Sequence, residues 1–291
     1  MEALTKTLNS LSTGDTKYRL NNLQPFTVSL SSFLTTTSSP PSGFLGPLVN
    51  LTSKTLADNN ANVTLMALAL LETIATSYDS REMSPYYTSL SNDLTAGVYP
   101  EAKSSVRTKT LQVVSYVFRR IVEDDTHDSV VGLGNFFDGC VKKTFAEKNW
   151  RVRLMGLQVF ESIAAMGNIL PCLTARTKAH TRGRVGTKAA SSSAPALNDA
   201  IASSIGLLND RREEVREQAI STTIACYRHN KQQLRRAMKK ATIQTSIVSS
   251  LEMKFAEIDV AEVDAEADLD AADTDEYKNN HHTKNTHNAH P

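Results

Sequence analysis

The 291-residue sequence has no long apolar run and few cysteines, and each absence excludes a class of protein. A membrane-spanning helix needs about 18 consecutive apolar residues, and no stretch approaches that length. The N-terminus has no basic segment followed by an apolar core, so no secretory signal peptide is expected. The cysteines, Cys140, Cys172 and Cys226, form no CxxC pair. Their spacing excludes a disulfide-rich scaffold and indicates reduced, intracellular thiols.

Motifs for catalysis and for metal binding are missing as well. Residues 183–188 lack the GxxxxGK[ST] order of a phosphate loop, and Gly132-Leu133-Gly134 does not continue into a dinucleotide fingerprint. The C-terminal histidines match no metal-site spacing, and the acidic run 262–276 lacks the glycine of a calcium loop. The sequence therefore predicts a non-enzymatic protein with no cofactor and no bound metal.

Charge is divided unevenly along the chain, although its net value is only +1. Residues 257–291 hold ten acidic and two basic side chains, a net charge of −8, so residues 1–256 carry +9. A basic body favours an acidic partner surface. Beyond residue 260 the sequence is acidic, then polar and rich in histidine, and has too few apolar residues to fold alone. We expect 261–291 to be a disordered tail.

Four segments share one helical pattern, each beginning with a valine. A small residue follows four positions after each valine, and apolar residues follow seven and eleven positions after it. In the last segment these two positions hold Thr222 and Cys226 instead. These positions share one helical face, and the small residue would let a neighbouring helix approach closely. The four valines are Val63, Val106, Val152 and Val215; the small residues are Ala67, Thr110, Gly156 and Ala219.

The valines are 43, 46 and 63 residues apart, and the last interval contains an insertion of roughly twenty residues. A period of about 40–47 residues built from helix pairs is typical of HEAT or armadillo repeats. We therefore predict an all-α HEAT-repeat α-solenoid of about five to six helix pairs over residues 1–260. The helices that precede the valines are expected at 44–56, 85–98, 130–145 and 196–208.

The two ends of the solenoid are patterned less clearly. We predict the two helices of the first repeat at 4–11 and 18–34, and we expect Pro25 to interrupt the second of them. We predict the two helices of the last pair at 230–238 and 242–258. The insertion, 174–194, carries five basic and no acidic residues and is rich in glycine and serine. We predict a flexible loop on the edge opposite the turns within the repeats.

A short polar turn precedes each valine, and equivalent turns of a stacked solenoid align along one edge. Three of the four turns carry basic residues. The arginines that follow three of the valines, Arg107, Arg153 and Arg216, recur so regularly that we expect a structural role between neighbouring repeats.

The fifth repeat resembles the last repeats of CLASP-family TOG domains. The likeness lies in Leu207–Arg216, Tyr227-Arg228-His229 and Met253–Asp259, and Lys148–Arg153 is similar to the fourth-repeat turn of that family. It is strong over 140–260 and rests mainly on the repeat pattern over 40–140.

The resemblance implies a flat HEAT paddle whose turns grip an αβ-tubulin dimer and regulate microtubule growth. It implies a cytoplasmic, cytoskeletal protein on microtubules, including those of the spindle or cilium, with αβ-tubulin or the microtubule lattice as partner and other microtubule-associated proteins as further candidates. The tubulin-binding residues implied are Lys17, Tyr18, Asn60, Asn62, Lys103, Lys148, Asn149, Trp150, Arg211 and Arg212.

Two alternatives stay open. The first turn, residues 14–19, holds no tryptophan, whereas many tubulin-binding TOG domains have one in that turn. This favours a HEAT scaffold or adaptor for proteins other than tubulin. The basic insertion suggests nucleic-acid binding, which would depend steeply on salt and which we rank below both protein-binding functions. Trp150 either anchors a partner or packs against the next repeat. No membrane partner is expected.

Overall fold

The computed structural model describes all residues except 38–40, 102, 124–126, 168–192 and 283–291. The described residues form helices and connecting turns, with no strand among them. The chain divides into two units, Met1–Thr242 and Ile243–Pro291. The predicted insertion, 174–194, lies almost wholly outside the described residues. No helix in the part of the chain that the structure describes is long and apolar enough to cross a membrane.

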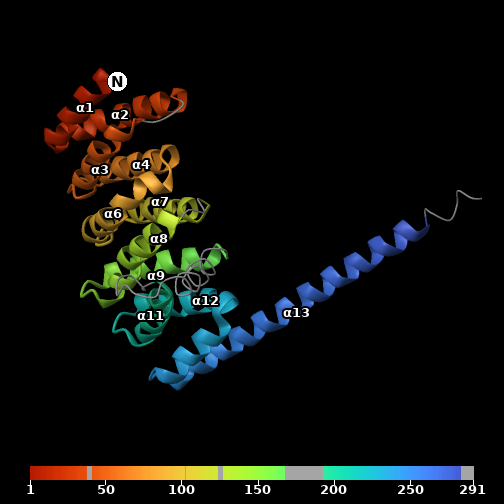
Figure 1. Cartoon of the computed structure of the whole chain (residues 1–291). Coiled ribbons are helices and arrows are strands. Elements are labelled where there is room, and N and C mark those ends of the chain that lie inside the picture. The colour runs from red at the N-terminus through yellow and green to blue at the C-terminus, as the bar shows by residue number, and fades with distance from the viewer. Residues whose placement is uncertain (38–40, 102, 124–126, 168–192, 283–291) are drawn as a thin grey trace, which may run out of the picture. The chain divides into compact units, whose positions relative to one another are not determined.

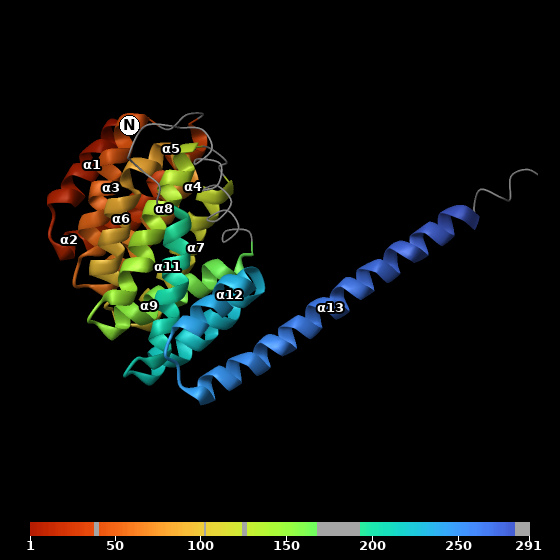
Figure 2. The same ribbon diagram turned by 60° about the horizontal axis from the view of Figure 1, so that its bottom comes forward.

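The first unit is a stack of five helix pairs, and Figures 1 and 2 show the pairs following one another from the N-terminus. Each helix packs against the other helix of its own pair and against the corresponding helices of the neighbouring pairs. The first helices are α1 (Glu2–Thr13), α3 (Ser42–Leu56), α5 to η2 (Ser80–Val98, including α6, Tyr87–Asp93), α8 with η3 (His127–Cys140, Lys142–Ala146), and α11 with η4 (Ser193–Gly206, Leu207–Asn209). The second helices are α2 (Thr16–Thr36), α4 (Ala61–Ser77), α7 (Ser104–Glu123), α9 (Trp150–Ala165) and α12 (Glu213–Lys240).

The predicted repeat register is confirmed by the core. Val63, Val106, Val152 and Val215 are all buried, and so are the residues four, seven and eleven positions after each of them. The seventh position of the last segment holds a threonine, Thr222, whose hydroxyl donates to the Leu157 carbonyl of α9 at 3.1 Å. The hydroxyl of Thr222 is therefore satisfied where it is buried.

The small residue of the third pattern, Gly156, marks a close contact between helices. A Cβ atom placed there would come within 1.8 Å of the Thr144 hydroxyl oxygen of η3. Glycine at this position lets η3 lie directly on the backbone of α9.

Polar side chains join the second helices outside the apolar core. Lys109 of α7 pairs with Glu72 of α4 at 2.6 Å, and Ser115 of α7 shares a hydrogen bond with Ser162 of α9 at 2.7 Å. From α12, Ser221 donates to Glu161 of α9 at 2.5 Å. These contacts are specific to each pair of neighbours and therefore favour one order of stacking.

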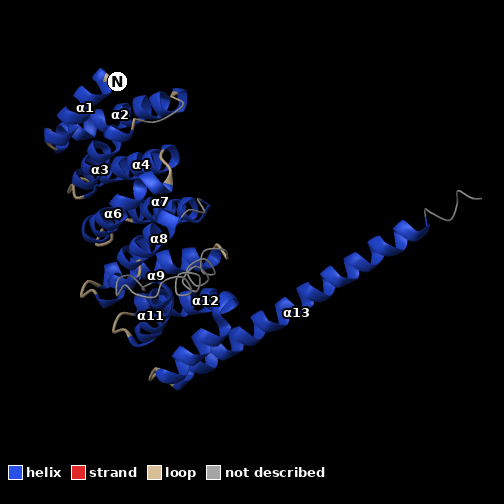
Figure 3. Cartoon of the chain, viewed as in Figure 1, coloured by secondary structure: helices blue, strands red, loops and turns tan. Residues whose placement is uncertain are grey.

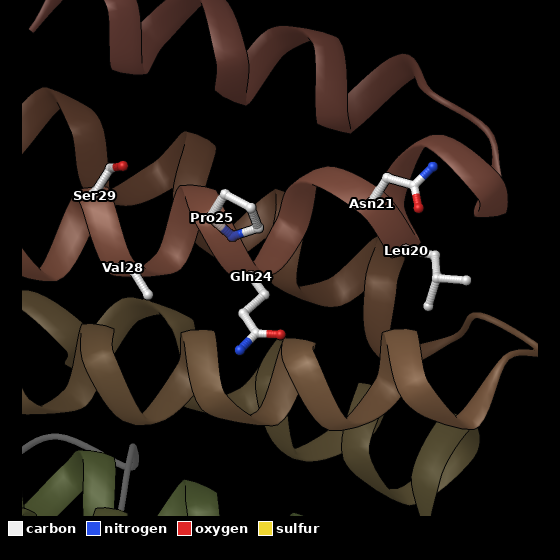
Figure 4. Close-up of a pocket in the computed structure, with 6 residues that line it drawn as sticks. All are labelled: Leu20, Asn21, Gln24, Pro25, Val28 and Ser29. Carbon is white, nitrogen blue, oxygen red and sulfur yellow. The ribbon is translucent and has the colours of Figure 1, made fainter.

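The expectation that Pro25 interrupts the first repeat is wrong, because α2 runs through it without a break. A proline inside a helix leaves the carbonyl four residues earlier without a donor. Asn21 and Pro25 are both exposed, so water can satisfy that carbonyl. Figure 4 shows the six residues that line a shallow hollow of about 550 Å³ on this helix: Leu20, Asn21, Gln24, Pro25, Val28 and Ser29.

The predicted break near residue 230 is present as a kink within α12, where two helical segments meet. Asn230 has non-helical backbone angles, φ −139° and ψ 40°, and is buried. The second unit consists of α13 (Thr245–His282). It continues as a helix across 261–282, where we expected disorder. Alanine, the residue that most favours a helix, recurs five times there.

Candidate functional site: the edge formed by the turns

The turns within the five helix pairs follow one another along one side of the first unit, as Figure 3 shows. We call this side the turn edge and define it by the described residues 14–18, 57–62, 99–101, 103, 147–151 and 210–212. Its second helices begin at defined caps in three repeats, where the side chains of Asp15, Asn60 and Asn149 accept backbone N–H groups of the first turn. Such caps fix where each helix starts, and with it the direction of the neighbouring exposed side chains.

Two aspartates fasten one turn to the next. Asp58 of the second turn accepts from Arg19 of α2 at 3.2 Å and from the Thr16 hydroxyl at 3.0 Å. Asp210 of the fifth turn accepts from Arg153 of α9 through two bonds, Nε–Oδ2 at 2.8 Å and Nη2–Oδ1 at 3.1 Å. The side chains of Asp58 and Asp210 are only 2% and 7% exposed. Both contacts join neighbouring repeats at the turn edge.

Arg153 also organises its own turn. Its Nη1 donates to the carbonyls of Glu147 and Lys148, at 2.6 and 3.0 Å. In the next repeat, Arg216 donates in the same way to the carbonyls of Asp210 and Arg211, at 2.9 and 3.3 Å. The structural role expected for these two arginines is confirmed, whereas no side-chain contact is seen for Arg107 within the described residues.

The ion pair changes the acidity of Asp210. Burial alone would raise its pKa, but hydrogen bonds from the Arg153 side chain and from the Arg212 backbone N–H outweigh burial. The pKa of Asp210 therefore lies below its usual value, and the carboxylate is charged at neutral pH.

Trp150 lies between the fourth and fifth turns. The guanidinium groups of Arg151 and Arg212 lie 5.2 and 5.4 Å from its ring centre, within the range of a cation–π contact. The ring is half-buried, while Lys148 and Arg211 beside it are exposed. Trp150 thus contacts the next repeat through Arg212 and still presents part of its surface. We call Lys148, Trp150, Arg151, Arg211 and Arg212 the Trp150 patch.

The remaining predicted residues lie on the turn edge but do not join this patch. Tyr18 is 39% exposed, and its ring lies against Gly14, where a Cβ would come within 2.7 Å of it. Lys17, Asn62 and Lys103 are exposed. Asn60 caps α4, and Asn149 caps α9 by accepting from the Arg151 N–H at 3.0 Å. The structure therefore joins the first turn to the second and the fourth to the fifth, and only at the fourth and fifth turns do predicted cations gather around a tryptophan.

The acidic residues that set the turns share one position in the sequence repeat. The residue five positions before each repeat valine is acidic: Asp58, Glu101, Glu147 and Asp210. In three of these four turns the acidic side chain accepts a hydrogen bond from the backbone N–H of the residue two positions later. The donors are Asn60, Lys103 and Arg212.

Two thiols lie in the core away from this edge. Burial raises the pKa of Cys140 to about 12, and burial raises that of Cys226 further. Both thiols therefore stay protonated at neutral pH and are poor nucleophiles. Cys172 lies outside the described residues.

The stacked pairs, the aligned turns and the ion pairs between repeats define a HEAT-repeat α-solenoid. Among solved structures, the crystal structure of the MAST/Orbit N-terminal domain is similar, with 17% identity and a TM-score of 0.59 over 87% of this chain and 96% of that one. The TOG domain from C. elegans Zyg9 is similar, with 18% identity and a TM-score of 0.56 over 87% of this chain and 81% of that one. The chain therefore has the fold of a TOG domain. No family model and no curated protein matches the sequence.

Proposed function

We propose that this chain is a non-enzymatic TOG domain protein of the CLASP type, which binds αβ-tubulin through the turn edge and regulates microtubule dynamics on the cytoplasmic cytoskeleton. The observation that carries the proposal is the Trp150 patch. Tryptophan and arginine are the residues that most often dominate binding energy at protein interfaces. Here a half-exposed tryptophan lies between two arginines and beside two further exposed cations.

The way the patch is built supports a binding role. The Arg153–Asp210 ion pair and the cap at Asn149 hold the fourth and fifth turns in place before any partner arrives. A preorganised surface loses less conformational entropy on binding than a flexible one. Asp210, the acidic residue of the fifth turn, is paired with Arg153 and therefore does not offset the exposed cations. Lys17, Tyr18, Asn60, Asn62 and Lys103 would add contacts further along the same edge.

The decisive experiment is a titration of soluble αβ-tubulin into the labelled full chain at low and at near-physiological salt. We expect saturable one-to-one binding at both. Binding only at low salt, or none, would contradict the proposal and would favour the scaffold function, for which the first turn without tryptophan is the supporting observation.

Replacing both Arg211 and Arg212 with alanine is expected to raise the tubulin Kd by about 10- to 100-fold, because two interface cations and one cation–π contact are lost. The association rate should fall and become less sensitive to salt. Fluorescence anisotropy and stopped-flow association measure both quantities.

The matched control removes two exposed cations from the other end of the same helix, Arg236 and Lys240. It changes the net charge equally and should leave the Kd within about twofold, since the turn edge is intact. Equal losses from both double variants would mean that net charge, rather than the Trp150 patch, attracts tubulin.

A further inference from the structure

The outward face of α2 holds the positions that the other repeats bury when they stack. Each repeat valine is the third residue of its second helix; these helices begin at Ala61, Ser104, Trp150 and Glu213. In α2, which begins at Thr16, the third residue is Tyr18, and the residues seven and eleven positions later are Pro25 and Ser29. All three are exposed, whereas the same positions are buried in the other four second helices.

The exposure of these positions follows from the place of α2 in the stack. In α12 the seventh position contacts the preceding second helix, because the Thr222 hydroxyl donates to the Leu157 carbonyl of α9 at 3.1 Å. The helix α2 belongs to the first pair, so no second helix precedes it in this chain (Figure 1). Its outward face is therefore a stacking surface that the described residues leave uncovered.

This surface carries no charge. No acidic or basic residue lies between Arg19 and Lys54, although such residues make up 22% of the chain. Solenoid ends are usually closed by a polar outer face, and the solvent-facing side of a helix is usually charged. Here Val28 is instead 61% exposed and Pro25 is exposed. Loss of charged residues together with exposed apolar ones is typical of the core of a protein interface.

The same face has a shape that fits a second helix. The shallow hollow on α2 is lined by two rows of side chains, each with a spacing of four residues (Figure 4). The rows are Leu20, Gln24 and Val28, and Asn21, Pro25 and Ser29. Rows of this spacing are the ridges with which helices most often pack, each ridge lying in the groove of the other helix. A helix with the same two rows would therefore fit the hollow.

The absence of charge decides which helix can cover this face. A charged occupant would lose its hydration without gaining an ion pair, which is unfavourable. Head-to-tail stacking of copies would bring the last pair onto α2, and α12 of that pair has the exposed cations Arg228, Arg236, Lys239 and Lys240. Two α2 faces meet without any such penalty. A contact between identical faces also closes after two copies, as most homo-oligomers do.

We propose that two copies of this chain associate through α2, with the two helices packed across a two-fold axis and Val28 of each copy covered by the other. The helix has 21 residues and is therefore about 31 Å long. One helix from each copy buries less than the about 800 Å² per partner of a stable complex, so we expect a Kd in the tens of micromolar. The dimer has two turn edges and can bind a partner with repeated sites more tightly than one copy can. The association itself does not depend on what the turn edge binds.

The test is analytical ultracentrifugation of the full chain from about 1 to about 200 μM. We expect a reversible equilibrium between monomer and dimer, with no larger species. Val28→Asp should raise the dimer Kd at least about tenfold, because it buries an unpaired carboxylate next to its own copy. The matched control is Val260→Asp, at a valine of α13 that is also 61% exposed; it should dimerise like the original chain. Circular dichroism verifies that both variants keep their helix content.

A mixing experiment tests whether the two α2 faces meet each other. Val28→Lys should weaken the dimer as Val28→Asp does. An equimolar mixture of the two variants should associate at least about tenfold more tightly than either alone, because the carboxylate of one copy now meets the ammonium of the other. A mixture of Val28→Lys with Val260→Asp should show no such recovery.

Four results would overturn the inference. The first is a chain that stays monomeric over the whole concentration range. The second is a dimer that Val28→Asp leaves unchanged or that Val260→Asp weakens equally. The third is growth beyond the dimer, which would mean head-to-tail stacking. The fourth is a mixture of Val28→Asp and Val28→Lys that associates no better than either variant alone, because the two α2 faces would then not meet.

Discussion

Replacing Gly156 with alanine is expected to lower the free energy of unfolding by about 2 kcal/mol, although alanine favours a helix more than glycine does. In an open helix the same change gains up to about 1 kcal/mol. Here the new Cβ would lie 1.8 Å from the hydroxyl oxygen and 2.8 Å from the Cβ of Thr144. Rotating the hydroxyl removes only the first clash, so η3 and α9 must move apart, and overpacking of this kind costs about 1–3 kcal/mol or more.

The chain contains a matched control for this prediction at Gly206. A Cβ placed there meets nothing within 4 Å. Gly206→Ala should therefore leave stability unchanged or raise it slightly, and thermal melts of the two variants should shift in opposite directions. A shift of several degrees downward is expected for Gly156→Ala. Equal shifts would mean that η3 does not rest on α9 in solution.

A second substitution tests the cause of the Gly156 effect. Thr144→Ala removes the hydroxyl and the methyl group but keeps the Cβ at 2.8 Å. In the Gly156→Ala background it should restore part of the lost stability, because one of the two clashes disappears. In the original background it should cost stability, since the buried Thr144 hydroxyl donates to the Val141 carbonyl at 2.5 Å. Such opposite effects show direct coupling between the two sites.

The repeat architecture could be predicted from the sequence because its cause is local and periodic. Val63, Val106, Val152 and Val215 mark the start of each buried stripe, and each stripe follows helical periodicity closely enough to be recognised without a partner. The predicted bounds of the helices that precede these valines lie within a few residues of the observed bounds at most ends. The pattern could not show that the helix turn around Pro25 is exposed, so that water can satisfy the carbonyl that the proline leaves without a donor. For this reason Pro25 was wrongly expected to break the helix.

The candidate site was predictable in its location but not in its connections. Lys148, Trp150, Arg211 and Arg212 stand in polar turns, and stacking alone places such turns on one edge. The contacts among them join residues about 60 positions apart, and no local pattern encodes which arginine meets which aspartate. The disorder predicted for 261–291 stays a prediction, because acidic, alanine-rich segments favour disorder by composition and helix by propensity, and the two criteria disagree there.

Asp210→Ala is expected to lower the free energy of unfolding by about 2–3 kcal/mol. The change leaves the guanidinium of Arg153, whose side chain is 15% exposed, without its carboxylate. Removing one partner of a buried pair costs about 3–5 kcal/mol, and Arg153 keeps its two carbonyl contacts, which reduces the loss. Urea denaturation measures it. The control is Asp199→Ala, which breaks the Lys142–Asp199 pair. The two charged atoms of that pair are 3.1 Å apart, but the side chains are 34% and 57% exposed. Because exposed pairs contribute about 0–1 kcal/mol, the control should lose at most that much stability.

The same pair should also weaken in acid, and the direction follows from the lowered pKa of Asp210. A carboxylate whose pKa is lower in the folded state stabilises the fold above its unfolded pKa, about 3.9. That contribution is lost as pH falls through the lower, folded-state value. Asp210→Asn should therefore be clearly less stable than the original chain at pH 7 and at pH 5. The difference should shrink once the pH drops below about 4.

A stability gap that persisted unchanged into strong acid would mean that the shape of the Asp210 side chain matters and its charge does not. The fifth turn would then be held by the carbonyl contacts of Arg153 and Arg216 alone. If the gap closes as expected, the charge of Asp210 helps to hold the fourth and fifth turns in register. In that case Asp210→Asn should also weaken tubulin binding at neutral pH, although Asp210 itself is too buried to touch a partner, because Arg212 and Trp150 would no longer be held together.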